Sequence, residues 1–94
     1  MAQQIIWTKR ADSTLYKQVS YLAEHWSERV VTEFVDKVYH TTNLLTDFPE
    51  MGKVIDAKKG IRSVLINPHV RLSYRIDDDK VVLIRFTDTR QNPT

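Results

Sequence analysis

Histidine and arginine alternate with apolar residues in the segment His69-Val70-Arg71-Leu72-Ser73-Tyr74-Arg75-Ile76. Alternate side chains of a β-strand point to the same face, so the pattern predicts that His69, Arg71 and Arg75 share an exposed face. Cleavage of RNA by its own 2′-hydroxyl requires a base, an acid and positive charge at the scissile phosphate. Arg71 suits only the last task, because a permanently protonated guanidinium is a poor base. His69 is a candidate base or acid, since histidine exchanges protons near neutral pH, and the alternative is an ordinary exposed residue after a turn.

Basic residues are concentrated in the second half of the chain. Between residues 51 and 76 the only acidic residue is Asp56, whereas the first 47 residues carry five basic and six acidic residues. A basic surface attracts nucleic acid and acidic proteins alike, because long-range Coulomb attraction does not distinguish phosphate from carboxylate. The alternative, which we favour for Arg75, is a solvated face with weak ion pairs to residues such as Asp77, Asp78 or Asp88. The basic residues between 51 and 76 are Lys53, Lys58, Lys59, Arg62, Arg71 and Arg75.

The remaining candidate ligands do not predict a metal site. His25 and His40 fall in helical segments without partners at ligand spacing, and the chain has no cysteine. We therefore expect no metal and no cofactor. The largest aromatic residues fall at positions typical of core packing, in preference to a platform on which bases would stack. They are Trp7, Trp26, Phe34 and Phe48.

Length and composition indicate one folded domain. A chain of 94 residues has too little apolar surface for two cores, and its hydrophobic share of 41% and charged share of 28% are ordinary for a globular protein. No run approaches the roughly 20 apolar residues of a membrane-spanning helix, and the first residues lack the pattern of a signal peptide. We therefore expect a cytoplasmic protein that makes no contact with a membrane.

Two segments show the apolar spacing of three and four residues that is typical of amphipathic helices. The first predicts a helix from about Lys9 to His25, with Thr8 as a candidate N-cap. The second begins after Ser27, also a candidate N-cap, and ends before Pro49, which cannot continue the helical hydrogen bonds. Because only one or two residues separate the helices, they must fold back as a hairpin. The apolar stripes are Leu15, Val19, Leu22 and Trp26, and then Val31, Phe34, Val35, Val38, Thr42 and Leu45.

Four segments are typical of β-strands. Gln4–Thr8 is short, β-branched and aromatic, and a turn and short loop are expected between residues 49 and 60. Ile61–Ile66, His69–Ile76 and Lys80–Thr87 are separated by turns and predict an antiparallel meander, to which the first strand adds. The sequence therefore predicts an α+β fold of two layers in the order β-α-α-β-β-β, with the helical hairpin on the apolar side of a mainly antiparallel sheet.

This order of elements resembles the RelE/ParE superfamily, the toxins of type II toxin–antitoxin systems that are also described as plasmid stabilisation proteins. The resemblance covers nearly the whole chain and implies a single toxin domain over residues 1–94. It depends on the joint order of several pieces, none of which is specific alone. The pieces are the turn Pro49-Glu50-Met51-Gly52, the segment Ile61-Arg62-Ser63-Val64, the strand end Tyr74-Arg75-Ile76 and the closing Thr87-Asp88-Thr89-Arg90-Gln91-Asn92-Pro93.

The resemblance implies one of two activities. RelE-like toxins are endoribonucleases, or mRNA interferases, that cut messenger RNA on the ribosome, whereas ParE-like toxins poison DNA gyrase and have lost most of the basic site. Arg71 and Arg90 correspond to the strand arginine and the arginine after the last strand, and Arg62 aligns with an earlier basic position. The chain departs from the ribonuclease pattern at Val64, where a second basic residue is expected, and lacks the distal tyrosine. The resemblance also implies an antitoxin that wraps the toxin domain in a hetero-oligomer.

We therefore favour a ParE-like growth inhibitor neutralised by a cognate antitoxin. A second hypothesis is a ribosome-dependent mRNA endoribonuclease whose candidate catalytic residues are Arg62, His69, Arg71 and Arg90. A third is a module that keeps the fold and the binding of antitoxin without toxicity.

Overall fold

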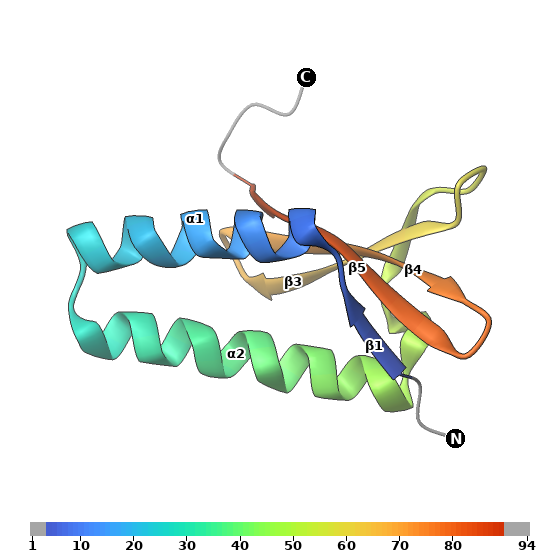
Figure 1. Cartoon of the computed structure of the whole chain (residues 1–94), viewed down its shortest axis with the longest axis horizontal. Coiled ribbons are helices and arrows are strands. Elements are labelled where there is room, and N and C mark those ends of the chain that lie inside the picture. Colours follow the sequence, from blue (N-terminus) through green and yellow to red (C-terminus); the bar gives the residue numbers. More distant parts are fainter. Residues whose placement is uncertain (1–3, 90–94) are drawn as a thin grey trace.

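The computed structural model describes residues 4–89 as a helical hairpin on one face of a curved, five-stranded sheet (Figure 1). This is the two-layer α+β arrangement that the sequence predicts. The helices are α1 (Lys9–His25) and α2 (Glu28–Asp47), followed by the 3₁₀ turn η1 (Pro49–Met51). The strands are β1 (Gln4–Trp7), β2 (Lys53–Asp56), β3 (Ile61–Asn67), β4 (Val70–Asp77) and β5 (Lys80–Asp88).

Both helices begin at the residues that the sequence marks as N-caps. The Thr8 hydroxyl accepts a hydrogen bond from the Ala11 N–H, and the Ser27 hydroxyl accepts one from the Val30 N–H. Each bond satisfies an amide that the first turn of a helix leaves without a partner. Within the described residues, no helix has both the length and the apolar character needed to cross a membrane.

The strands are arranged in the order β1-β5-β4-β3-β2. The meander of β3, β4 and β5 is antiparallel, as predicted, and β1 joins the sheet beside β5 with parallel direction. β1 pairs only with residues 80–83 of β5, because the chain then leaves the sheet and enters α1. The second half of β5 therefore has β4 on one side and α1, in place of another strand, on the other.

The strand β2 was not predicted, because residues 49–60 were expected to form a turn and a loop. Lys53 and Val54 pair antiparallel with Ser63 and Arg62 of β3, and a bulge follows before Asp56. This strand has only four residues, lies at the edge of the sheet and has two charged ends. So short a segment has no clear alternation to distinguish it from a loop.

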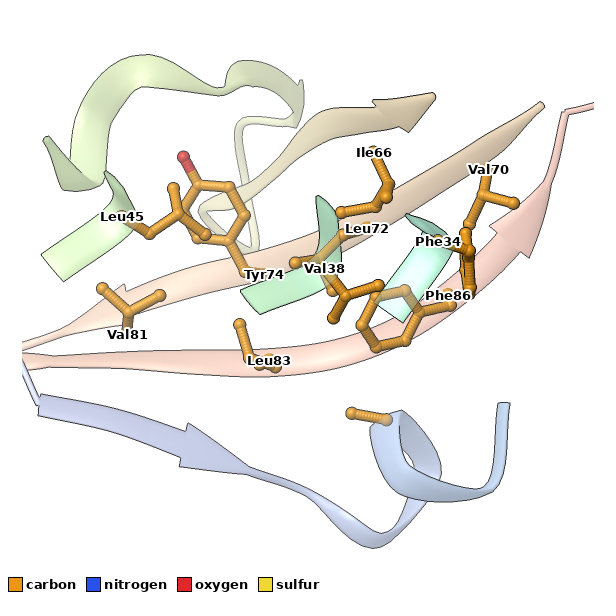
Figure 2. Close-up of a cluster of buried hydrophobic side chains, with 11 residues drawn as sticks. Phe34, Val38, Leu45, Ile66, Val70, Leu72, Tyr74, Val81, Leu83 and Phe86 are labelled. Atoms are coloured by element: carbon orange, nitrogen blue, oxygen red, sulfur yellow. The ribbon is translucent and has the colours of Figure 1, made fainter. Parts of the chain in front are cut away.

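The core lies between the helices and the sheet (Figure 2). Phe34, Val38 and Leu45 of α2 meet a layer of strand residues, and α1 contributes the fully buried Ala11. The strand residues of this core cluster are Ile66, Val70, Leu72, Tyr74, Val81, Leu83 and Phe86.

Two of the four aromatic residues predicted in the core are exposed instead. Trp7 stacks on Phe86 and Phe34 is buried, as expected. Trp26 and Phe48, however, are 59% and 60% exposed. Each is the C-cap residue of its helix, and its backbone has left the helical conformation. A side chain at such a position no longer continues the helical stripe, which is why spacing alone misplaced both residues.

Candidate functional site

Side chains from four strands meet on the sheet face that the helices leave uncovered. Residues directly opposite each other in antiparallel strands share a face, so the strand register assigns these side chains. Leu65, Arg71 and Thr87 form one row across β3, β4 and β5. A second row runs across β2, β3, β4 and β5 and consists of Lys53, Ser63, Ser73 and Arg85. We call these two rows the bare sheet face.

Two arginines dominate the bare sheet face. Arg71 lies directly opposite Thr87, and Arg85 lies directly opposite Ser73, so the two guanidinium groups start from diagonal positions on neighbouring strands. Such diagonal neighbours are separated by about 7–8 Å at the backbone, within reach of a common ligand for long side chains. Both line one depression of about 260 Å³, together with Ile55, Ser73, Thr87, Asp88 and Thr89.

Within residues 4–89, the arginines of the bare sheet face form no ion pairs. Among residues 4–89 the structure has one ion pair, between Arg29 and Glu33 on exposed turns of α2. The surface pairs considered for Arg71 and Arg75 with Asp77 or Asp78 are therefore not formed. Two neighbouring guanidinium groups that pair with no carboxylate in the described part of the chain are suited to bind phosphate or carboxylate groups of another molecule.

Arg62 lies on the opposite side of the sheet from Arg71. It pairs with Tyr74, whose side chain is in the core, and its guanidinium donates to the carbonyl oxygens of Glu50 at 3.1 Å and Gly52 at 2.8 Å. These bonds hold the turn between α2 and β2 against β3. Arg62 therefore serves the fold at this position, and the structure does not bring it together with Arg71.

Tyr74 fixes the same turn from inside the core. Its hydroxyl donates to the Pro49 carbonyl at 2.7 Å and accepts from the Gly52 N–H at 2.9 Å. Burial raises the pKa of the Tyr74 phenol above its ordinary value of 10.0, while the bond from Gly52 and the nearby Arg62 charge oppose the rise. At Gly52 an added Cβ would lie 2.5 Å from the Tyr74 hydroxyl, so glycine is required by close approach.

His69 is separated from Arg71 because it precedes β4 and lies in the turn after β3. It is exposed and lines a depression on the helix side, beside Trp26, Phe34 and Val70. The prediction that His69 shares the strand face of Arg71 is therefore wrong. The turn interrupts the alternation that would have aligned the two side chains, and the Asn67 side chain fixes it by accepting from the N–H groups of His69 and Val70.

The other predicted positions have different outcomes. Val64 packs against the core from the helix side. Arg75 is exposed on β4, as expected for an ordinary solvated residue. Arg90 lies outside the described residues. No group of three His, Asp or Glu side chains within residues 4–89 is arranged to hold a metal ion.

Arg85 belongs to the bare sheet face but was not selected from the sequence. A bulge shifts the register of β5 between Ser73/Arg85 and Tyr74/Leu83. Strict alternation would place Arg85 on the same side as the buried Val81 and Leu83, whereas the bulge turns Phe86 into the core and Arg85 out of it. The sequence offers no local signal for this bulge.

Comparison with known proteins gives one family and several similar structures. Residues 5–93 match the family described as ParE toxin of type II toxin-antitoxin system, parDE. No curated protein sequence is similar enough to the chain to count as a match.

Solved toxin–antitoxin complexes share the fold. A chain of the RelBE2 complex from Mycobacterium tuberculosis is 24% identical, with a TM-score of 0.64 and coverage of 94% of this chain and 99% of that one. A chain of the chromosomal ParDE system from P. aeruginosa is 11% identical, with a TM-score of 0.77 and coverage of 93% and 96%. A chain of the E. coli DinJ-YafQ complex is 15% identical, with a TM-score of 0.64 and coverage of 94% and 93%.

Proposed function

Because the chain belongs to the family of ParE toxins of type II toxin–antitoxin systems, we propose that it arrests growth by binding a large cytoplasmic target, such as DNA gyrase, without cutting RNA. The bare sheet face is the proposed contact surface, with Arg71 and Arg85 at its centre. Arginine is well suited to this role, since its planar guanidinium binds carboxylates and phosphates through two parallel hydrogen bonds.

The observation that carries the proposal is the separation of His69 from the arginines. Cleavage at a 2′-hydroxyl requires a base on one side of the phosphate and an acid on the other. The depression that holds Arg71 and Arg85 contains one carboxylate, Asp88, and no histidine among its described lining residues. His69 lies on the helix side, and Arg62 is bound to backbone carbonyls. The described residues thus supply charge for binding, and they do not supply an acid–base pair.

The proposed regulator is a cognate antitoxin. Similar folds occur in the RelBE2 and DinJ-YafQ toxin–antitoxin complexes and in the chromosomal ParDE toxin–antitoxin system. An antitoxin that covers the bare sheet face would mask the two arginines and so prevent contact with the target.

Two assays on the same variants test the proposal. The purified chain is added to DNA gyrase with relaxed plasmid, and supercoiling and linearised DNA are measured. We expect inhibition by the 94-residue chain and a loss of at least about tenfold in potency for Arg71→Ala/Arg85→Ala, since an arginine anchor at the centre of an interface contributes about 2 kcal/mol or more. Lys58→Ala/Lys59→Ala is the matched control, because it removes two exposed cations from the turn between β2 and β3.

In cells, induction of the chain should produce double-strand breaks and an SOS response, without new 5′ ends in messenger RNA. New cuts in translated messages that disappear in Arg71→Ala/Arg85→Ala would instead establish the ribonuclease hypothesis. The one observation that favours this hypothesis is the neighbouring guanidinium groups of Arg71 and Arg85. Induction without any growth effect would support the third hypothesis, a module that binds antitoxin and is not toxic.

A further inference from the structure

A polar stripe on α1 borders a groove of which the proposed function uses only Arg85 and Thr87, the two residues that also lie on the bare sheet face. Arg10, Thr14, Lys17, Gln18 and Tyr21 recur at the helical spacing of three and four residues, so they lie on one side of α1. Together with Arg85, Phe86, Thr87 and Asp88 of β5, they line a depression of about 670 Å³. We call this depression the α1–β5 groove. It exists because β1 pairs only with the first half of β5 and leaves α1 beside the second half.

Three cations that form no ion pair with any residue from 4 to 89 surround the groove. Arg10, Lys17 and Arg85 are exposed, and none forms an ion pair within the described residues. One carboxylate, Asp88, lies among them. The groove therefore carries an excess of positive charge that no described carboxylate cancels at contact distance.

The groove is continuous with the bare sheet face. Arg85, Thr87 and Asp88 line both the α1–β5 groove and the depression that contains Arg71. A path of four cations thus leads from Arg71 across Arg85 to Arg10 and Lys17 on the helix. Arg10 and Lys17 are seven residues apart, which is about 10 Å along a helix axis, or the rise of about three nucleotides in one strand of B-form DNA.

The geometry points to a binding site for the phosphodiester backbone of a nucleic acid in the α1–β5 groove. Phosphate contacts from Arg and Lys dominate affinity for nucleic acids, and such contacts need an extended row of cations more than a closed pocket. Polar side chains beside the cations, namely Gln18, Tyr21 and Thr87, are suited to donate hydrogen bonds to phosphate oxygens.

An acidic protein segment fits this groove less well. Protein interfaces need aromatic or arginine anchors buried in well-packed pockets, and charge outside such pockets mainly increases the rate of association. The aromatic lining residues are Phe86, which is 3% exposed and stacked on Trp7, and Tyr21, whose ring already stacks on His25, and no described aliphatic Leu, Ile, Val or Met side chain lines the groove. The half-buried Leu22 and Val30 and the exposed Trp26 line a different depression, which shares Gln18 and Tyr21 with the groove.

The inference goes beyond the proposed function and does not depend on it, because the groove is tested by binding alone. The 94-residue chain is titrated into three fluorescently labelled probes at several salt concentrations. The probes are a duplex DNA of about 20 base pairs, a single-stranded RNA of about the same charge, and a poly-glutamate peptide of about the same charge. Affinity and the slope of log affinity against log salt are measured for each.

Two double variants locate the site. Arg10→Gln/Lys17→Gln should weaken binding to the nucleic acid by at least about tenfold and make the salt slope shallower by about 2, one for each phosphate that the variant no longer neutralises. Lys58→Gln/Lys59→Gln removes the same charge from the exposed turn between β2 and β3 and should leave the affinity within about threefold. Circular dichroism checks that both variants fold, which is expected because all four side chains are exposed.

The outcomes separate clearly. Tighter binding to the duplex identifies DNA as the source of the phosphates, and tighter binding to the single strand identifies RNA, so either result supports the site. The inference is overturned if neither nucleic acid binds, if poly-glutamate binds as tightly as the nucleic acids, or if the two double variants lose affinity equally.

Discussion

At the scale of single residues, Tyr74 shows how one side chain can serve both the core and a turn. Its ring is fully buried beside Leu45 (Figure 2), and its hydroxyl bonds to Pro49 and Gly52. A buried hydroxyl is tolerated only when it has hydrogen-bond partners, and here it satisfies a donor and an acceptor of the chain where α2 passes into β2. The turn is therefore fixed by a residue that lies far along the chain, in β4.

Removing the Tyr74 hydroxyl should destabilise the fold. In Tyr74→Phe the Gly52 N–H and the Pro49 carbonyl lose their partner, and an unsatisfied buried donor costs about 1–3 kcal/mol. We expect the free energy of unfolding, measured in urea, to fall by about 2 kcal/mol. Tyr39→Phe is the control, because Tyr39 is 57% exposed, and a change of less than about 0.5 kcal/mol is expected there. Equal effects of the two substitutions would contradict the role of the hydroxyl.

The raised pKa of Tyr74 predicts a loss of stability in alkali. A phenol whose pKa is higher in the folded than in the unfolded state keeps its proton longer in the folded state. Its contribution to stability is therefore complete below pH 10, the ordinary pKa, and is lost as the pH rises through the folded value. The free energy of unfolding, measured in urea from about pH 8.5 to about pH 11, should fall more steeply with pH for the native chain than for Tyr74→Phe. This range brackets the ordinary pKa of a phenol. Parallel curves would exclude this linkage.

Single residues also show where sequence reasoning about the site succeeds and fails. Arg71 was predicted on an exposed strand face, and the strand register places it there because Val70 and Leu72 beside it are buried. His69 and Arg85 were misplaced or missed for the same physical reason. A turn before β4 and a bulge in β5 each change the phase of the alternation. Asn67 marks the turn but does not show that His69 belongs to it, and no nearby residue type marks the bulge.

At the scale of elements, α1 is fastened to β5 by two threonines. The Thr8 hydroxyl donates to the Leu83 carbonyl at 2.7 Å, and the Thr14 hydroxyl accepts from the Phe86 N–H at 2.9 Å. These bonds lie on either side of the β5 bulge, where β1 no longer supplies hydrogen-bond partners. Helix side chains thus take over the role of a missing strand, and they fix the groove between α1 and β5.

Replacing Thr14 tests this fastening. Thr14→Val keeps the shape but leaves the Phe86 N–H without its acceptor, so the free energy of unfolding should fall by about 1–2 kcal/mol. Thr14→Ser keeps the hydroxyl, so its free energy of unfolding should fall distinctly less than that of Thr14→Val. Thr32→Val on α2 is the matched control, since Thr32 is an exposed threonine in the middle of a helix. If Thr32→Val lowered the free energy of unfolding as much as Thr14→Val, the loss would come from the lower helix propensity of valine and not from the missing hydrogen bond.

The elements themselves were largely predictable, for identifiable reasons. Both helices carry apolar stripes and hydroxyl caps, so their starts at Lys9 and Glu28 follow from local signals. β2 was missed because a four-residue edge strand is stabilised by pairing with β3 and by the contacts of Tyr74 and Arg62 with the preceding turn. Those are long-range interactions, which no local pattern reports.

At the scale of the whole molecule, stability decreases from the centre of the sheet toward β2. β4 and β5 lie at its middle and carry the fully buried Leu72, Tyr74, Val81 and Leu83. β2 pairs on one side only, and its Val54 and Ile55 are about half exposed. Because segments with few buried apolar contacts open most readily, amide hydrogen exchange should be at least about tenfold slower in β4 and β5 than in β2.

The same gradient predicts how the molecule responds to Tyr74→Phe. The Tyr74 hydroxyl binds the turn that leads into β2, so its loss should release residues 49–56 locally, in addition to lowering global stability. Exchange in β2 should therefore accelerate by at least about tenfold more than in β1, which lies at the other edge of the sheet. Mass spectrometry of native exchange followed by proteolysis resolves the two edges. A uniform acceleration would mean that the hydroxyl supports only the global fold, and that the edge at β2 opens together with the rest of the sheet.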